Sequence, residues 1–529
     1  MLSASTVSGQ QPGPSLPPRD QRPAQQTGSG VIRGRVIAAD TNTPLRRAQI
    51  QLSPMTAEGA ESRTTTTADD GTYEFTQLVA GRYGLKASKG GYVGIEYGQR
   101  RPFEKGRPIE VADRQVLEHI DLTLPPGAVL TGRVTDETGE PVARAWVQLA
   151  RYRYFNGRRR LVGDYGDSTD DRGEFRVFGI PPAEYLLSAS FSEGADRSTD
   201  KIKYVQTFYP GTTSRADAQR IRVKLGGELS NLTIALMRQR TASVSGVVRA
   251  STAFSVVMAR RTDGEDSDAH DSFVDSRGAF SITGLLPGAY AIDAQSFFGN
   301  ERASSEVKVE AADITGLVLT MSAGAAARGQ VRFEDGTPPR DLLPSQVLLF
   351  ASGDEEFSSG QQAPPPVRSD WTFELTGIHG KSLLSGVGGR EWRVKRVSIA
   401  GNDFTDVPID FSNGDVNGIE VLLSNRQTEV AGQVTDVRGV VAGDTTVVVF
   451  PADPEQWTAK RRYIEAARPD QQGRYHFEGL PAGRYLVIAV DYLEDGEEQN
   501  PDLLKEWARL ATSMTLADGE KRVLDLKVV

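Results

Sequence analysis

The pattern of apolar and polar positions repeats a unit of two short strands joined by a tight connection. The clearest unit covers residues 470–489 and opens on an Asp-x-x-Gly turn. Tyr475 and Phe477 then alternate with polar residues, and after Leu-Pro-Ala-Gly a second alternating run begins at Tyr485. Because side chains alternate across a strand, each apolar set lies on one face. The unit therefore predicts two half-buried strands that share a core.

The same unit recurs along the chain. Ten positions separate the first aromatic residue from the tyrosine in each clear unit (73 to 83, 175 to 185, 280 to 290, 475 to 485). A degenerate unit begins at Asp370, where Trp371 replaces the turn glycine, so this turn is expected to differ. The other turn glycines are expected at positive φ, and the tyrosines are expected in the core. These tyrosines are Tyr83, Tyr185, Tyr290 and Tyr485, and these glycines are Gly71, Gly173, Gly278 and Gly473.

A Gly-x-Val motif precedes each unit, and alternating apolar residues close it. Short strands separated by turn signals are typical of a β-sandwich, and a period of about 80–105 residues fits an array of whole domains. The chain is therefore predicted to be all-β: a tandem array of five antiparallel β-sandwich domains with a short C-terminal helix. The predicted parts are a disordered tail at 1–29 and sandwiches at 30–126, 127–240, 241–322, 323–426 (the degenerate copy) and 427–529.

This combination of motifs resembles the carboxypeptidase regulatory-like domain. The resemblance rests on Gly-x-Val-x-Asp, Asp-x-x-Gly-x-aromatic and Leu-Pro-x-Gly-x-Tyr, which recur over nearly the whole chain past Gly30. It implies a transthyretin-like, carbohydrate-binding-like β-sandwich. Domains of this family occur as accessory modules beside peptidases and as stalks of adhesins, so the resemblance implies no single activity.

Charge and composition narrow the function classes. The net charge of −9 argues against nucleic acid as a partner. The absence of cysteine excludes disulfides and thiol nucleophiles. The sequence shows no signal-peptide core and no long apolar run, so no transmembrane segment is predicted. Residues 1–9 nevertheless fit the end of a signal whose upstream part is missing from the gene start. The predicted location is secreted, periplasmic or cell-envelope, with the cytoplasm as the alternative.

Catalytic chemistry is not indicated by the residues present. No histidine has a partner at zinc-ligand spacing, and His476 is expected on the solvent face between Tyr475 and Phe477. The chain is therefore predicted not to be an enzyme, with no catalytic residue, cofactor or metal site. Calcium stays open as an alternative to plain turn residues, because carboxylates are hard oxygen ligands. The relevant groups are His119, His270, His379 and His476, and the carboxylates Asp69, Asp70, Asp167, Asp170, Asp171, Asp263, Asp266 and Asp268.

Binding is the remaining hypothesis. Loop aromatics can stack on sugar rings, and packing within the sandwich is the alternative for each. The segment 151–160 is basic with interleaved aromatic residues, and it fits either a patch that binds an anionic ligand or a long solvated hairpin. Residues 500–510 are predicted to form a helix that caps the last sandwich. The candidate ligand-contact aromatics are Tyr97, Phe208, Tyr209 and Trp457, together with Tyr92.

The chain is accordingly interpreted as a non-enzymatic envelope or extracellular protein with a binding or structural role. Its expected partner is carbohydrate or another envelope protein. The alternatives are an accessory module of a hydrolase and a passive spacer without a ligand.

Overall fold

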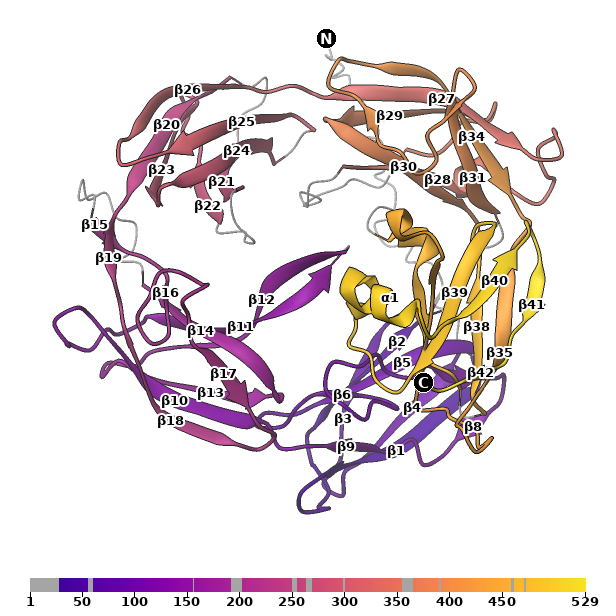
Figure 1. Ribbon diagram of the computed structural model, residues 1–529, viewed down its shortest axis with the longest axis horizontal. Helices are drawn as coiled ribbons and strands as arrows, with labels where there is room; N and C mark the ends of the chain where they lie inside the picture. Colours follow the sequence, from indigo (N-terminus) through magenta and orange to yellow (C-terminus); the bar gives the residue numbers. More distant parts are fainter. Residues whose placement is uncertain are drawn as a thin grey trace, which may run out of the picture. The chain divides into compact units, whose positions relative to one another are not determined.

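The fold is all-β, as predicted, and Figure 1 follows it from the indigo N-terminal strands to the yellow C-terminal ones. Among the residues described, one α-helix is present, near the C-terminus. Nearly all of the tail predicted at 1–29 lies outside these residues, as do Asp263, Asp266 and Asp268 of the calcium hypothesis. The computed structural model describes residues 28–55, 60–155, 157–191, 202–249, 255–262, 269–297, 300–353, 365–389, 392–457, 461–470 and 472–529.

The chain divides into two compact units. The first comprises residues 1–88 and 108–124, and the second comprises residues 89–107 and 125–529. Segment 89–107 therefore belongs to the second unit. The repeats are called copies one to five below, with the predicted boundaries.

In the first unit, β1 pairs antiparallel with β4 and parallel with β8 and β9, while β2 pairs with β3 and β5. The strands are β1 (Gly30–Ala38), β2 (Gln49–Pro54), β3 (Arg63–Thr66), β4 (Thr72–Leu78), β5 (Gly81–Ser88), β7 (Ile109–Val111), β8 (Val116–Leu117) and β9 (Leu122–Leu124).

Copies two and three each place a three-stranded sheet over a larger one, with a hydrophobic cluster for each copy. The strands are β10 (Ala128–Thr135), β11 (Trp146–Phe155), β12 (Arg158–Ser168), β13 (Glu174–Ile180), β14 (Ala183–Ser190), β15 (Ile202–Tyr204), β16 (Thr207–Phe208), β17 (Arg220–Val223), β18 (Glu228–Ala235), β19 (Arg238–Arg240), β20 (Ala242–Arg249), β21 (Ser255–Arg261), β22 (Ala269–Phe273), β23 (Ala279–Leu285), β24 (Gly288–Ser296), β25 (Arg302–Val309) and β26 (Ile314–Thr320).

Copy four joins its strands into one eight-stranded sheet, because β31 pairs with both β30 and β34. The elements are β27 (Ala325–Phe333), η1 (Pro344–Gln346), β28 (Val347–Gly353), β29 (Thr372–Ile378), β30 (Lys381–Gly388), β31 (Trp392–Ile399), β32 (Asn402–Asp403), β33 (Ile409–Asp410) and β34 (Val416–Ser424).

Copy five has a hydrophobic cluster on each face of its β37-β36-β39-β40 sheet. The outer cluster includes Leu504 and Trp507 of α1, so the predicted C-terminal helix does cover this sheet. The elements are β35 (Glu429–Thr435), β36 (Thr446–Pro451), η2 (Pro454–Gln456), η3 (Arg461–Tyr463), β37 (Glu465–Ala467), β38 (Arg474–Glu478), β39 (Gly483–Val490), η4 (Glu497–Gln499), α1 (Pro501–Trp507), β40 (Thr512–Leu516), β41 (Lys521–Val523) and β42 (Leu526–Lys527).

The first strand of each copy runs parallel to at least one later strand, which the alternation of the sequence does not reveal. Most strand pairs are antiparallel, as predicted, but β10 and β18 run parallel from Val129 and Glu228 to Thr135 and Ala235. The Gly-x-Val glycine lies at this pairing. A Cβ on Gly132 would lie 1.9 Å from the Leu232 carbonyl oxygen. The motif therefore marks a close backbone approach that a side chain would block.

The core tyrosines are buried, as predicted: Tyr83, Tyr185, Tyr290 and Tyr485 are 0–2% exposed. Each hydroxyl donates to the carbonyl oxygen four residues earlier, at 2.7–3.0 Å. A buried phenol needs such a partner, and the tight connection between the two strands supplies it.

The turn glycines Gly71, Gly173, Gly278 and Gly473 have φ of 70–82°, as predicted. The expectation that the turn at Trp371 differs is wrong. Trp371 takes the same conformation with φ 65°, and its N–H donates to the Arg368 carbonyl as that of Gly71 donates to the Ala68 carbonyl. Its ring packs edge-on against Phe333 at 4.7 Å. This packing compensates for a strain of about 1–2 kcal/mol in a non-glycine residue.

Candidate functional site: an ionic junction in the second unit

Segment 89–107 forms an ordered loop held by its own carboxylates. It contains β6 (Ile95–Glu96), and Glu96 accepts a hydrogen bond from the Gly106 N–H at 2.8 Å. Glu104 accepts the N–H groups of Arg100 and Arg101 at 3.1 and 3.2 Å. The loop thus presents several cationic side chains from a fixed backbone.

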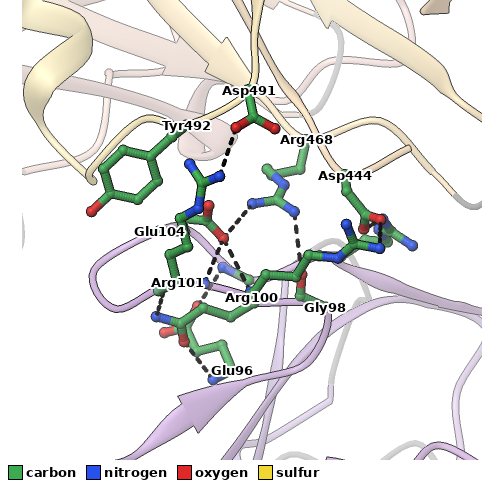
Figure 2. A network of polar contacts seen from close by, with 12 residues as sticks. Glu96, Gly98, Arg100, Arg101, Glu104, Asp444, Arg468, Asp491 and Tyr492 are labelled. Carbon is green, nitrogen blue, oxygen red and sulfur yellow. Dashed lines mark hydrogen bonds and ion pairs between the residues drawn. The ribbon is translucent and has the colours of Figure 1, made fainter. Parts of the chain in front are cut away.

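Its central contact is a buried ion pair with copy five. Figure 2 shows the Arg468 guanidinium pointing at Glu104 and at the Gly98 carbonyl, each at 3.2 Å. Both side chains of the pair are 3% exposed, and Arg468 Nε has no hydrogen-bond partner within the described residues. Removal of one member of such a pair costs about 3–5 kcal/mol, because the other charge stays buried and unpaired.

Asp444 forms a second contact, just before β36. Arg107 donates to the Asp444 carboxylate at 2.8 Å and to the Gly443 carbonyl at 2.6 Å. Arg100 pairs with the other carboxylate oxygen of Asp444 (Figure 2). One carboxylate therefore receives two guanidinium groups.

Segment 491–499, which lies in the connection between β39 and β40, forms a third contact with segment 89–107. Arg101 pairs with Asp491 at 2.7 Å and lies over the Tyr492 ring at 5.2 Å (Figure 2). Lys105 pairs with Asp495 at 3.0 Å and Glu498 at 3.2 Å. The carboxylates of this segment thus face the cations of segment 89–107.

The β11–β12 hairpin of copy two reaches the same acidic segment. Arg151 is 5% exposed, pairs with Glu494 at 2.6 Å and lies over the Phe103 ring at 3.4 Å. The Gly157 N–H donates to Gln499 at 2.9 Å. The long hairpin predicted at 151–160 is present, but it is not simply solvated, because Arg151 is buried in this junction.

Copy four also contacts copy five. Asp406 accepts hydrogen bonds from Nε and Nη2 of Arg462 in a bidentate pair, each at 2.8 Å, and the Tyr463 hydroxyl donates to it at 2.9 Å. Lys395 of β31 pairs with Asp518 and with Glu334. Copy five therefore makes charged contacts with copies two and four and with segment 89–107.

The junction shifts the pKa of several of its groups. Burial by itself lowers the pKa of Lys105, but its ion pairs with Glu498 and Asp495 outweigh burial and raise that pKa. Burial, with the nearby Glu494, raises the pKa of the Glu497 carboxyl. The cation is thus held charged, which suits a structural ion pair and does not suit a proton-transfer base near neutral pH.

The sequence carries one signal for this junction, which is a pair of oppositely charged runs. Residues 491–502 hold six carboxylates (Asp491, Glu494, Asp495, Glu497, Glu498 and Asp502), while residues 100–107 hold four cations (Arg100, Arg101, Lys105 and Arg107). Opposite charge runs that far apart suggest pairing, but nothing in a single sequence shows that the two runs meet.

The candidate ligand-contact aromatics lie in different surroundings. Phe208 is 3% exposed and Trp457 is 7% exposed, and the Trp457 indole N–H donates to the Pro451 carbonyl at 2.9 Å. Neither ring is accessible to a sugar in this arrangement. Tyr209 is half-buried against the copy-two core, and Tyr97 and Tyr92 are half-buried in segment 89–107. The structure does not bring these five residues together.

The histidines lie in separate copies. His476 is exposed between buried Tyr475 and Phe477, as predicted, and lies 3.5 Å from Glu478. His379 contacts the Asn300 carbonyl at 3.1 Å, and burial lowers its pKa. His119 is exposed and His270 is half-buried on β22. Within the described residues, no group of three or more histidine, aspartate or glutamate side chains could hold a metal ion.

A helix must be long and apolar to span a membrane. None of the helices in the described part of the chain is sufficiently long and apolar to cross a bilayer.

Comparison with known structures gives matches of low similarity. The Bacillus anthracis TIE protein is 14% identical with a TM-score of 0.16, and the match covers 56% of this chain and about half (51%) of that one. GBS52, the minor pilin of Streptococcus agalactiae, is 15% identical with a TM-score of 0.21, over 39% of this chain and 95% of that one. BcpA, the major pilin subunit of Bacillus cereus, is 11% identical with a TM-score of 0.14, over 55% and 99%. These scores are too low to extend the likeness to assembly or function.

Comparison with protein families is more specific. No curated protein matches the chain. The model of the carboxypeptidase regulatory-like domain matches residues 31–125, which include β1 to β9 and segment 89–107. The tyrosine and turn-glycine positions of that range, Tyr83 and Gly71, have the geometry seen in the other clear copies. The chain therefore contains a carboxypeptidase regulatory-like domain at residues 31–125.

Proposed function

We propose that this chain is a non-enzymatic structural protein of the cell envelope or exterior, in which copy five holds segment 89–107 and copies two and four in fixed positions. The observation that carries the proposal is the buried Glu104–Arg468 pair, with 3% exposure of each side chain. A flexible spacer does not need buried ion pairs between segments far apart in sequence. Charged residues can stay on its surface, where they avoid the cost of desolvation.

The chemistry of the junction supports a structural role. Six carboxylates of the junction each pair with a guanidinium or ammonium group, so their charges are already used in pairing: Glu104, Asp444, Asp491, Glu494, Asp495 and Glu498. The Arg101–Tyr492 and Arg151–Phe103 contacts add cation–π attraction, which is larger where the cation is desolvated. Recognition of carbohydrate or protein then falls to surfaces outside this junction.

The experiment is a double-mutant cycle on the full chain, with Glu104→Gln, Arg468→Met and the double variant. Each single variant is expected to destabilise the second unit by about 3–5 kcal/mol, and the double variant by less than the sum. Urea unfolding gives the free energies, and limited proteolysis reports exposure of segment 89–107.

The matched control is Glu429→Gln, which removes the exposed Lys521–Glu429 pair of copy five. That variant is expected to change stability by less than about 1 kcal/mol. If Glu104→Gln behaves like this control and its protease pattern is unchanged, the chain is a spacer without a functional junction. Cleavage of peptide or ester substrates by the purified chain would instead support the hydrolase reading, and cell fractionation tests the envelope location.

A further inference from the structure

The ionic junction connects parts of the second unit that lie far apart along the chain. Glu104 and Arg468 are in contact at 3.2 Å although 364 positions separate them. Copies two, three and four lie in the intervening chain, which would span roughly 120–130 nm if it were fully extended. Tension that enters segment 89–107 can therefore pass directly to copy five, without loading copies two to four.

Main-chain groups reinforce the ion pairs of this direct connection. The Asp495 N–H donates to the Phe103 carbonyl at 2.8 Å, and the Tyr492 hydroxyl donates to the Pro102 carbonyl at 3.1 Å. A hydrogen bond to a carbonyl oxygen of the main chain holds the backbone itself, whereas an ion pair between long side chains can yield as those side chains rotate. Segment 491–499 is thus fastened to the backbone of segment 89–107 as well as to its charges.

Copy two contacts the same segment of copy five. Gly496 has φ 95°, and a Cβ at this position would lie 2.4 Å from the Tyr154 carbonyl oxygen, so the close approach requires glycine. The Arg151–Glu494 ion pair joins the same two segments. Because copy five also contacts copy four, copies two to five form a closed circuit of contacts within the second unit.

The copies in this circuit are built to resist a pull on their ends. The first strand of each runs parallel to a strand near the end of the same copy: β10 to β18, β20 to β26 and β27 to β34. A pull that separates the two ends of a copy slides these strands past each other, so their hydrogen bonds share the load and must break nearly together. The junction consists of separate contacts that can break one after another, and it therefore opens before a copy unfolds.

We infer that the junction is a mechanical clasp. Under tension between segment 89–107 and the end of copy five, it holds first and then opens, and it releases copies two to four as folded length. The clasp can close again when the load falls, because the released copies keep their cores. This inference rests on the proposed structural role in the envelope and adds a behaviour under load.

Single-molecule force spectroscopy on the full chain tests the clasp. The chain has no cysteine, so Gly90→Cys and Val529→Cys supply the only two thiols for the handles. Gly90 is exposed with no atom within 4 Å of an added Cβ, and Val529 is 59% exposed. Both handles lie in the second unit, one on each side of the junction.

Two kinds of event are expected, and their lengths differ. A folded domain of about 100 residues has a radius of gyration near 1.3 nm and is roughly 3–4 nm across. Opening of the clasp puts the first unit and copies two to four in series while they are folded, which lengthens the tether by roughly 10–15 nm in one early step. Unfolding of one copy of about 100 residues adds roughly 30 nm.

Two variants weaken the clasp in different ways. Arg468→Met leaves Glu104 buried and unpaired, and it is expected to abolish the early step. Gly496→Ala blocks the approach of Tyr154 without changing any charge, and it is expected to lower the force of that step. The matched control is Gly439→Ala, which has a similar φ of 82° with no atom within 4 Å of the added Cβ and should leave the step unchanged. Later steps of about 30 nm show that the copies of each variant are folded.

A first event of about 30 nm in the unaltered chain would overturn the clasp. An early step at the same force in Arg468→Met and Gly496→Ala would do so as well. The proposed structural role is judged separately: coupling between Glu104 and Arg468 in the urea double-mutant cycle, without an early step under force, would leave that role in place and refute only the clasp. Absence of the coupling would refute the structural role itself.

Discussion

The close backbone approach at the Gly-x-Val motif predicts a large loss of stability when Gly432 of copy five is replaced by alanine. In Gly432→Ala, the new Cβ would lie 1.9 Å from the Leu524 carbonyl oxygen and 3.0 Å from the Tyr475 ring. That carbonyl accepts the Tyr475 hydroxyl at 2.5 Å, and the Leu524 N–H donates to Ala431 at 2.8 Å. The alanine must push the chain between β41 and β42 away, so both hydrogen bonds are strained or lost.

The expected cost follows from two terms. Overpacking costs about 1–3 kcal/mol, and a buried hydroxyl left without its acceptor costs about 1–3 kcal/mol. Gly432→Ala should therefore destabilise the chain by about 2–6 kcal/mol. Equilibrium urea unfolding, followed by far-ultraviolet circular dichroism and by tryptophan fluorescence, gives this value and shows whether copy five unfolds separately.

Gly439→Ala is the control for the backbone term alone. Gly439 lies in the same copy at φ 82°, and no atom lies within 4 Å of its added Cβ. Its cost should be about 1–2 kcal/mol, from the left-handed conformation only. If Gly432→Ala is no more destabilising than Gly439→Ala, the close-approach explanation of the motif is wrong.

Three further predictions concern the core and the pH dependence. Tyr485→Phe should cost about 0.5–1.5 kcal/mol through loss of the hydrogen bond to Pro481, and Tyr485→Ala about 3–5 kcal/mol; equal costs in urea unfolding would contradict the hydroxyl's role. Backbone N–H groups lower the pKa of Asp275, so its stabilisation is present above the ordinary value near 3.8 and is lost as the pH falls; Asp275→Ala should flatten the acid limb of the stability–pH curve. The raised pKa of Lys105 gives stabilisation that is present below about 10.5 and lost at higher pH, so Lys105→Met should remove part of the alkaline limb and leave the acid limb unchanged.

Local patterns determined much of the fold. Period-two alternation located the strands around Tyr475 and Tyr485, and Asp-x-x-Gly located the turns, because both depend on neighbouring residues only. The parallel partners of β1, β8 and β9, could not be predicted, since the alternation of a strand is the same whether its neighbour is parallel or antiparallel. Trp371 was misjudged because its compensation comes from Phe333, which is distant in sequence.

The candidate site was less predictable for a related reason. The Glu104–Arg468 pair joins positions 364 residues apart, and burial of a charged residue has no local signature. Loop position alone suggested Phe208 and Trp457 as accessible aromatics, yet both pack into cores.

The two-sided burial of the copy-five sheet has a consequence during synthesis. All six residues of β36 are buried, and Val448 and Phe450 face the outer cluster that Trp507 of α1 completes. Trp507 follows Phe450 by 57 residues (507 minus 450), which a ribosome takes about 3–11 s to add at roughly 5–20 residues per second. During that interval a β-branched, uncharged segment without its cover has the composition that favours cross-chain strand pairing. A ribosome that stalls shortly before the helix, or a nonsense mutation there, would release a chain prone to aggregate even though most of its sandwiches are complete.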